Sequence, residues 1–259
     1  MSEYAAPELI DSHCHLDAAQ FDTDRADVVA RAIDAGVMSQ IVPAVALAGF
    51  EKLRGLCAST PDLYPAYGLH PMYLAEHQPE HLAALRGWLE KERPVAVGEC
   101  GLDFFIDDLD HDTQRMYFLR QLELAREFEL PVILHARRAV DEVIATLRKV
   151  GGLSGVVHSF SGSEEQARLL WKLGFCIGIG GPVTYARAKR LRSIVAQMPI
   201  EYLLLETDAP DQPLDGHRGE RNEPARLIEV LAHVATLRGD SAAAVGEATT
   251  LNARRLFRL

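Results

Sequence analysis

Short apolar runs recur along the chain and alternate with longer amphipathic stretches. Continuous apolar runs rich in valine, isoleucine and leucine are typical of parallel strands that are covered on both faces. We therefore predict eight parallel strands. They lie within Leu9–Leu16, Met38–Val45, Tyr64–His70, Pro94–Leu102, Leu130–Ala136, Gly155–Phe160, Phe175–Gly180 and Tyr202–Thr207.

The stretches between these runs carry helix signals. Helices are predicted over Asp24–Ala35, Phe118–Phe128, Ser163–Gly174, Leu227–Leu237 and Asp240–Phe257. The second and fourth have apolar residues at helical spacing, and the third opens with a capping box at Ser163–Gln166. Strands that alternate with helices predict an α/β fold, here a TIM-type (β/α)8 barrel. A doubly wound open sheet is the rival fold, but no glycine-rich phosphate fingerprint follows the first run.

The composition is that of a globular protein. The chain has 259 residues, 48% of them hydrophobic and 25% charged, which suits one barrel domain over residues 1–259. Its formal net charge of −10 argues against non-specific coating of nucleic acid or membrane. A phosphate-bearing substrate stays possible, because bound divalent cations would invert the local sign.

The cysteines indicate a reducing compartment. Cys14, Cys57, Cys100 and Cys176 show no C-x-x-C spacing, so neither a zinc knuckle nor a redox pair is expected. The first four residues lack the pattern of a signal peptide, and no apolar run reaches membrane-spanning length. We expect a cytoplasmic protein, a monomer, with no membrane partner.

A His-x-His pair ends the first apolar run. Side chains alternate along a strand, so His13 and His15 point to one side and Cys14 to the other. Two imidazoles on one side can hold one metal ion. Two neighbouring histidines alone are more often ordinary surface or turn residues, so the interpretation depends on the other strand ends.

Metal-ligand residue types gather at those ends, where barrel enzymes place their sites. Ten histidines spread over the chain would put fewer than one at the roughly sixteen inward positions of eight strand ends. Five are found there. The residues at these ends are His13, His15, His70, Glu99, Asp103, His135, Arg137, His158, Glu206 and Asp208.

Imidazoles and carboxylates together suit divalent ions such as Zn, Mg or Mn. Four histidines and two carboxylates are too many ligands for one ion, so we predict two divalent metal ions that share a carboxylate. The predicted ligands are His13, His15 and Asp208 for one ion, His135 and His158 for the other, and Glu99 as the bridge.

Such a centre predicts hydrolysis. Two ions can clamp the attacking and leaving oxygens of a displacement and lower the pKa of water to about 7. Asp208 could orient or deprotonate that water, and it forms the predicted catalytic pair with Glu99. Arg137, two residues after His135, is placed to bind a substrate phosphate oxygen.

Three further residues are predicted to bind substrate. His70 could donate to a phosphate, with a plain turn histidine as the alternative. Asp103 could lie near the substrate or fix a ligand imidazole, with a loop cap as the alternative. Arg221, together with Arg218, follows Asp208 on a loop and could form a nucleic-acid rim.

Two polar residues near the strand ends are assigned structural roles. Glu206 should hold an arginine or lysine in the barrel wall. Asn222 should cap the helix that begins around Pro224. Cys14 and Cys100 should face the helix layer as small buried residues, and a catalytic thiol is not expected because neither has an evident paired base.

The strand-end motifs resemble those of the TatD family of metal-dependent hydrolases in the amidohydrolase superfamily. They follow the family order over nearly the whole chain, and the segment from Ala209 resembles the YjjV-like branch. Cys100 stands where isoleucine is common. The matching motifs are Asp-Ser-His13-Cys-His15-Leu-Asp, Gly-Leu-His70-Pro, Val-Gly-Glu99-Cys-Gly-Leu-Asp103, Pro-Val-Ile-Leu-His135-Ala-Arg, Val-Val-His158-Ser-Phe, Glu206-Thr-Asp208-Ala-Pro and Arg-Asn222-Glu-Pro.

The resemblance implies a TIM-type barrel, a divalent-metal centre and hydrolysis of phosphodiester bonds in DNA, in some members as a 3′→5′ exonuclease. It implies metal ligation by the same six residues that the strand ends predict. One alternative is a small-molecule amidohydrolase or esterase with the same centre. No strand end carries a lysine that could form a carbamylated bridge, which favours the phosphodiesterase. A second alternative is a nucleic-acid-binding protein without catalysis, which has no need of an open two-metal site.

Overall fold

The computed structural model describes residues 8–106 and 108–259. Eight parallel strands form one sheet whose order, β1 to β8, follows the chain. The strands are β1 (Leu9–Asp11), β2 (Val37–Pro43), β3 (Leu63–Tyr67), β4 (Ala96–Asp103), β5 (Val132–Arg137), β6 (Gly155–Val157), β7 (Phe175–Ile179) and β8 (Leu203–Leu205). The interpretation of residues 1–4 as lacking a signal peptide lies outside the described residues.

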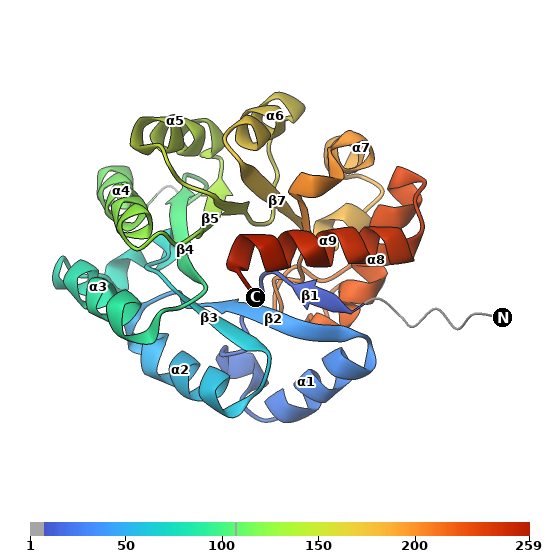
Figure 1. The fold of residues 1–259 in the computed structure, drawn as a ribbon, viewed down its shortest axis with the longest axis horizontal. Helices are drawn as coiled ribbons and strands as arrows, with labels where there is room; N and C mark the ends of the chain where they lie inside the picture. The colour runs from blue at the N-terminus through green and yellow to red at the C-terminus, as the bar shows by residue number, and fades with distance from the viewer. Residues whose placement is uncertain (1–7, 107) are drawn as a thin grey trace.

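Helices surround the strands, and the last helix crosses one end of the barrel (Figure 1). The α-helices are α1 (Arg25–Asp34), α2 (Phe50–Ser59), α3 (Glu80–Glu92), α4 (His111–Glu127), α5 (Val140–Val150), α6 (Glu164–Lys172), α7 (Lys189–Gln197), α8 (Leu227–Arg238) and α9 (Ala242–Phe257). The alternation of strand and helix confirms the predicted TIM-type (β/α)8 barrel.

The lower part of the barrel interior is an apolar layer with one residue from each strand. Its members are Ile10, Ile41, Ala66, Ala96, Ile133, Val156, Cys176 and Leu204. Ala253 and Phe257 of α9 join this layer and close the N-terminal end of the barrel. Residues two positions further along each strand point inward again, one layer closer to the C-terminal ends. His135, His158 and Glu206 occupy this second layer.

The barrel closes between β8 and β1 through loop residues as well as strands. The backbone N–H of Ser12 donates to Leu205 O at 3.0 Å, and that of Asp208 donates to His13 O at 2.9 Å. The buried Asp11 carboxylate accepts the backbone N–H of Thr207 at 3.0 Å. The paired strand therefore ends at Asp11, earlier than the apolar run that continues to Leu16. From Asp11 onward, hydrogen bonds to its carboxylate add to the backbone hydrogen bonds between these two segments.

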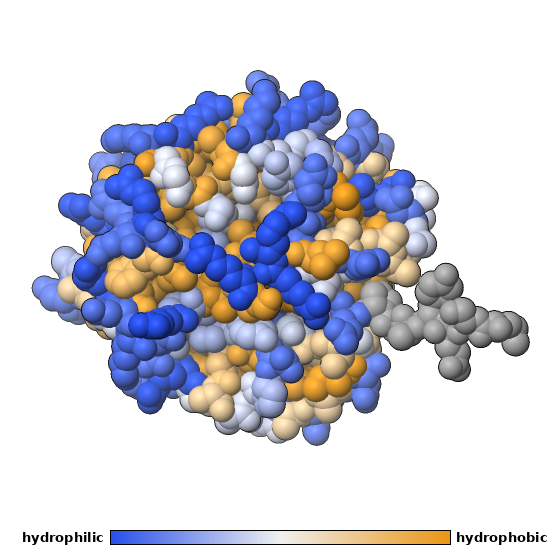
Figure 2. Space-filling model, viewed as in Figure 1, coloured by the Kyte–Doolittle hydropathy of each residue, from blue (hydrophilic) through white to orange (hydrophobic). Residues whose placement is uncertain are grey.

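The helix signals in the sequence correspond to helices in the structure. Ser163 and Gln166 form a reciprocal capping box at the start of α6, and α8 ends before Gly239, which has a left-handed backbone. Polar and apolar residues are interspersed over the face that carries α9 (Figure 2). Among the described helices, none combines the length and apolar character that crossing a bilayer requires.

Candidate metal centre

A cavity of about 680 Å³ opens at the C-terminal ends of the strands, within the size range of ligand sites. Most of the predicted site residues line it. They are His15, His70, Glu99, His135, Arg137, His158 and Asp208. His13 lies beneath them and is fully buried. Asp103 and Arg221 are not part of the lining.

The first group of converging atoms comes from the loop after β1, from β4 and from the loop after β8. His13 Nε2 and His15 Nε2 lie 3.2 Å apart. Oε2 of Glu99 lies 3.2 Å from the first nitrogen and 3.5 Å from the second. Oδ1 of Asp208 lies 3.5 and 3.6 Å from the same two nitrogens. These four atoms face one point.

A second group meets the other oxygen of the same carboxylate. Oε1 of Glu99 lies 2.8 Å from His158 Nε2 and 3.1 Å from His135 Nδ1, and the two nitrogens are 3.4 Å apart. Glu99 thus presents one oxygen to each group, as expected of a bridging ligand. The His-x-His residues follow β1 and Glu99 lies on β4, three strands further round the barrel, so the fold rather than a local turn brings them together.

In His15 and His135, one ring nitrogen faces Glu99 and the other faces away from it. The hydrogen bond of the outer nitrogen determines whether the inner nitrogen carries a lone pair. His15 Nδ1 lies 3.2 Å from Pro43 O, and His135 Nε2 lies 2.8 Å from Asp103 Oδ2. Both partners are acceptors, so we assign the ring hydrogens to these nitrogens, and the inner nitrogens are then acceptors that face other acceptors. Ligands at 2.0–2.1 Å from a tetrahedral ion are about 3.3 Å apart, so the observed spacings fit divalent cations.

Protons and cations compete for the charge in the centre: although burial opposes protonation of His15, hydrogen bonding and charge from Glu99 raise its pKa to about 9. Burial opposes ionisation of Glu99, but the neighbouring imidazoles of His158, His70 and His13 hold its pKa well below the usual range. Burial lowers the pKa of His70 to about 4, which keeps this imidazole neutral. Burial raises the pKa of Asp208 to about 6, although His158 and His15 oppose the shift. Metal ligation needs neutral imidazoles and ionised carboxylates.

His70 and Asp103 were predicted to contact substrate, but both contact other residues of the centre instead. Met72 N donates to His70 Nδ1 at 3.1 Å, so His70 Nε2 is the donor to Glu99 Oε1 at 2.9 Å. Both ring nitrogens of His70 are engaged in this structure, which favours a role in holding Glu99 over contact with a substrate phosphate. Asp103 is fully buried and accepts from His135, which favours the role of fixing a ligand imidazole over contact with substrate.

The arginines divide between the cavity and the protein surface. Arg137 lines the cavity with 44% of its side chain exposed, and its guanidinium stacks on Phe105 at 3.6 Å from the ring centroid. Arg221 corrects its prediction, because its two NH groups bind Asp24 at 2.8 and 2.6 Å. Arg218 is likewise paired, with Asp215.

Two structural assignments also change. Asn222 does not cap a helix. Its amide donates to the carbonyls of Thr207 and Asp211 at 2.9 and 3.0 Å and so fixes the loop that carries Asp208. Glu206 has no arginine or lysine partner within residues 8–106 and 108–259, contrary to the expected ion pair in the barrel wall. It lies instead beside His158.

Gln212 and Tyr73 are among the cavity residues that the sequence patterns did not predict. Gln212 donates to Asp208 Oδ2 and accepts from the Ser159 hydroxyl at 2.8 Å, so it fixes the orientation of the carboxylate. Its place four residues after Asp208 was the available signal. Tyr73 lines the cavity and is 41% exposed, but nothing in its sequence neighbourhood distinguishes it from a helix-face aromatic.

Known proteins of one family match this chain over nearly its full length. Residues 10–258 match the family described as TatD related DNase. The chain is 42% identical over 252 residues to the metal-dependent hydrolase YjjV of Escherichia coli K12, covering 96% of this chain and 97% of that protein. It is 38% identical over 265 residues to the 3′-5′ ssDNA/RNA exonuclease TatD of a Pantoea species, covering 97% and 100%.

A solved structure shares the whole architecture. The crystal structure of YjjV, a TatD homolog from Escherichia coli K12, superposes with a TM-score of 0.95 at 40% identity. The match covers 98% of this chain and 100% of that chain. Fold, length and sequence therefore agree on one family.

Proposed function

The chain belongs to the TatD family of metal-dependent hydrolases, and from that premise we propose that it cleaves phosphodiester bonds in DNA as a 3′→5′ exonuclease. The observation that carries the proposal is the pair of converging ligand groups that share Glu99 on the floor of an open cavity. The proposed ligands of two divalent ions are His13, His15, Glu99, His135, His158 and Asp208.

The residues of the chain supply the rest of the chemistry. Bound divalent ions would lower the pKa of water and neutralise charge on a phosphate. Asp208 is our proposed general base, because its carboxylate lines the cavity beside the ligand nitrogens and can accept a proton from a water held there. Gln212 and Asn222 hold that carboxylate and its loop in place. Glu99 keeps its charge between the two ligand groups.

The rim of the cavity suits a strand of nucleic acid. The exposed guanidinium of Arg137 can pair with a phosphate oxygen while Phe105 supports its other face. Tyr73 lines the cavity and is 41% exposed, and such an aromatic ring can stack with a base. A relative named as a 3′-5′ ssDNA/RNA exonuclease supports this substrate class and polarity.

The test is cleavage of 5′-labelled single-stranded DNA with added Mg²⁺ or Mn²⁺, comparing parent, His135→Ala and His233→Ala. We expect the parent to shorten the strand from its 3′ end. His135→Ala should lose more than about 100-fold in rate, since losing even an outer-shell partner costs 10–100-fold. His233 is exposed on α8, where its ring bonds to the Glu229 carbonyl of the same helix, so its replacement is the matched control.

The outcome separates the alternatives. Equal rates in parent and His135→Ala would remove the assigned centre. Hydrolysis of an aryl lactone or ester, with no action on DNA or an aryl phosphodiester, would favour a small-molecule amidohydrolase. Tight DNA binding without cleavage in either metal would favour a binding protein.

We also propose that the protein acts as a monomer in the cytoplasm. All four cysteines are free thiols in the described structure, which suits a reducing compartment. The interspersed polar surface of the face in Figure 2 suits exposure to solvent. Light scattering after gel filtration should give a mass near 28.6 kDa, and twice that mass would contradict the monomer.

A further inference from the structure

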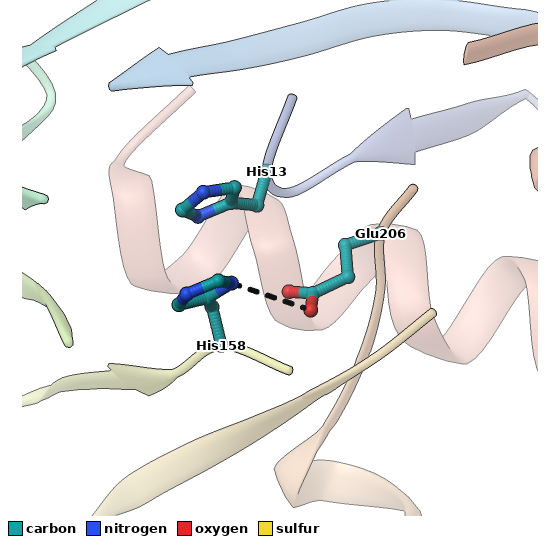
Figure 3. Close-up of side chains that lie close together, drawn as sticks. All are labelled: His13, His158 and Glu206. Atoms are coloured by element: carbon teal, nitrogen blue, oxygen red, sulfur yellow. Dashed lines mark ion pairs between the residues drawn. The ribbon is translucent and has the colours of Figure 1, made fainter. Parts of the chain in front are cut away.

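Glu206 is a buried carboxylate that the chemistry above does not use. It follows β8, and only 1% of its surface is exposed. Its Oε1 accepts the backbone N–H of Ser159 and lies 3.7 Å from His158 Nδ1 (Figure 3). Its Oε2 has no hydrogen-bond partner in the described part of the chain. A buried carboxylate oxygen is costly when it accepts no hydrogen bond.

Next to Glu206, two imidazoles each have a buried nitrogen that lacks a hydrogen-bond partner among the described residues. The rings of His13 and His158 stack with centroids 3.9 Å apart and planes within 10°. Both direct Nε2 at Glu99, at 3.2 and 2.8 Å. Their Nδ1 atoms are buried and, among the described residues, bond to nothing. When Nε2 acts as a ligand, Nδ1 carries the ring hydrogen and needs an acceptor.

The Glu206 carboxylate occupies the space that a side chain at Gly178 would fill. A Cβ added at Gly178, on the adjacent strand β7, would lie 2.0 Å from Glu206 Oε2. Even alanine is therefore excluded at position 178 unless Glu206 moves. Because no described lysine or arginine pairs with Glu206, the nearby side chains placed to donate hydrogen bonds to it are the two imidazoles.

We propose that Glu206 is a positioning residue shared by both halves of the metal centre. It accepts the Nδ1 hydrogens of His13, from the first ligand group, and of His158, from the second, and so turns both Nε2 lone pairs toward the ions. One candidate ligand atom from each of these three residues lies within 4.8 Å of the others, and His158 Nδ1 is 3.7 Å from Glu206 Oε1, so both bonds form when the side chains move closer together. The inference rests on the proposed metal centre.

The test is stepwise Mn²⁺ binding to the full chain, measured by isothermal titration and by electron paramagnetic resonance. Glu206→Gln keeps the size of the side chain but replaces one acceptor oxygen with a donor. We expect both Mn²⁺ affinities to fall by 10–100-fold. Glu223→Gln is the matched control, because Glu223 pairs with Arg31 at the surface and should leave both affinities unchanged.

A spectroscopic readout separates positioning from general damage. In the Zn²⁺-loaded parent, proton NMR should show slowly exchanging imidazole N–H signals from His13 and His158, in addition to those expected from His15 and His135. The first two should shift in Glu206→Gln, and the other two should not. Gly178→Ala provides a second variant that displaces the carboxylate without changing its charge, and its affinities should fall in the same direction. It decides the question if Glu206→Gln does not fold.

Each possible result contradicts a different part of the account. A parent that binds no metal would contradict the proposed function, and this inference with it. A parent that binds two ions, with unchanged affinities in a folded Glu206→Gln, would overturn the inference alone. Loss of only the affinity that depends on His158 would overturn the sharing between the two halves.

Discussion

Asp103 shows how a residue outside the cavity can control the chemistry within it. Its carboxylate is fully buried, with Oδ2 2.8 Å from His135 Nε2 and Oδ1 accepting the backbone N–H of Phe105 at 2.9 Å. The first contact fixes the ring hydrogen and the orientation of His135. Residues with this role affect metal affinity as strongly as many ligands do.

Asp103→Asn should weaken Mn²⁺ binding by 10–100-fold, because its amide NH₂ group can face the ring N–H where an acceptor is needed. Isothermal titration provides the measurement, and Asp112→Asn, at an exposed surface pair with Arg115, is the control. Unchanged affinity in Asp103→Asn would show that His135 does not depend on this partner.

Acid should release the metal. Burial raises the pKa of Asp208 to about 6 from an ordinary value of 3.8. The metal-free folded chain therefore binds more protons at this group than the unfolded chain, and its contribution to stability falls as pH rises from 3.8 to 6. A cation reverses this balance, because it binds the ionised form.

Mn²⁺ affinity should therefore rise with pH, by up to about tenfold per unit below pH 6 from this proton alone. Titrations at pH 5, 6 and 7 test the slope. Affinity that stays constant over this range would mean that Asp208 is not a ligand.

At the scale of elements, the capping box of α6 is a local feature with a local consequence. Ser163 Oγ accepts the N–H of Gln166 at 3.1 Å, and Gln166 Oε1 accepts the N–H of Ser163 at 2.7 Å. Ser163→Ala removes one of these bonds. The free energy of unfolding should fall by about 1 kcal/mol in urea denaturation. Ser193→Ala on α7 should change it by less than about 0.5 kcal/mol, and equal effects would contradict the capping role.

Sequence patterns predict elements well where the interactions are local. The capping box and the left-handed Gly239 that ends α8 involve neighbours in the chain, so the pattern contains the cause. The end of β1 was missed because it depends on Thr207, whose N–H and hydroxyl both bond to the Asp11 carboxylate. The pattern of apolar residues around position 11 contains no information about Thr207.

The same distinction holds for the site. The converging positions of His13, His15 and Glu99 were predictable, because inward alternation and strand ends follow from the barrel itself. The pairing of Arg221 with Asp24, 197 residues away, was not. The setting of Glu206 was missed for a similar reason, since its space comes from Gly178 on a neighbouring strand.

At the scale of the whole molecule, the two ends of the barrel have different tasks. The N-terminal end is filled by an apolar layer in which Phe257 of α9 is only 2% exposed. The C-terminal end carries the buried polar groups, which are stabilised when their charges are paired. Stability should thus depend on the closed end and metal chemistry on the open end.

Phe257→Ala should lower the free energy of unfolding by about 3–5 kcal/mol, because it leaves a cavity beneath the strands. Urea denaturation measures the loss, and Phe257→Leu, which retains most of the volume, should lose much less. Mn²⁺ affinity in the folded Phe257→Ala protein should match the parent. A large loss of affinity there would show that the two ends are coupled.

The central claim is that two divalent ions lie on either side of Glu99. Anomalous X-ray diffraction from Mn²⁺-loaded crystals tests it most directly. The account predicts two peaks about 3.5–4 Å apart, one beside His13, His15 and Asp208 and one beside His135 and His158. A single peak, or peaks that do not contact Glu99, would contradict it.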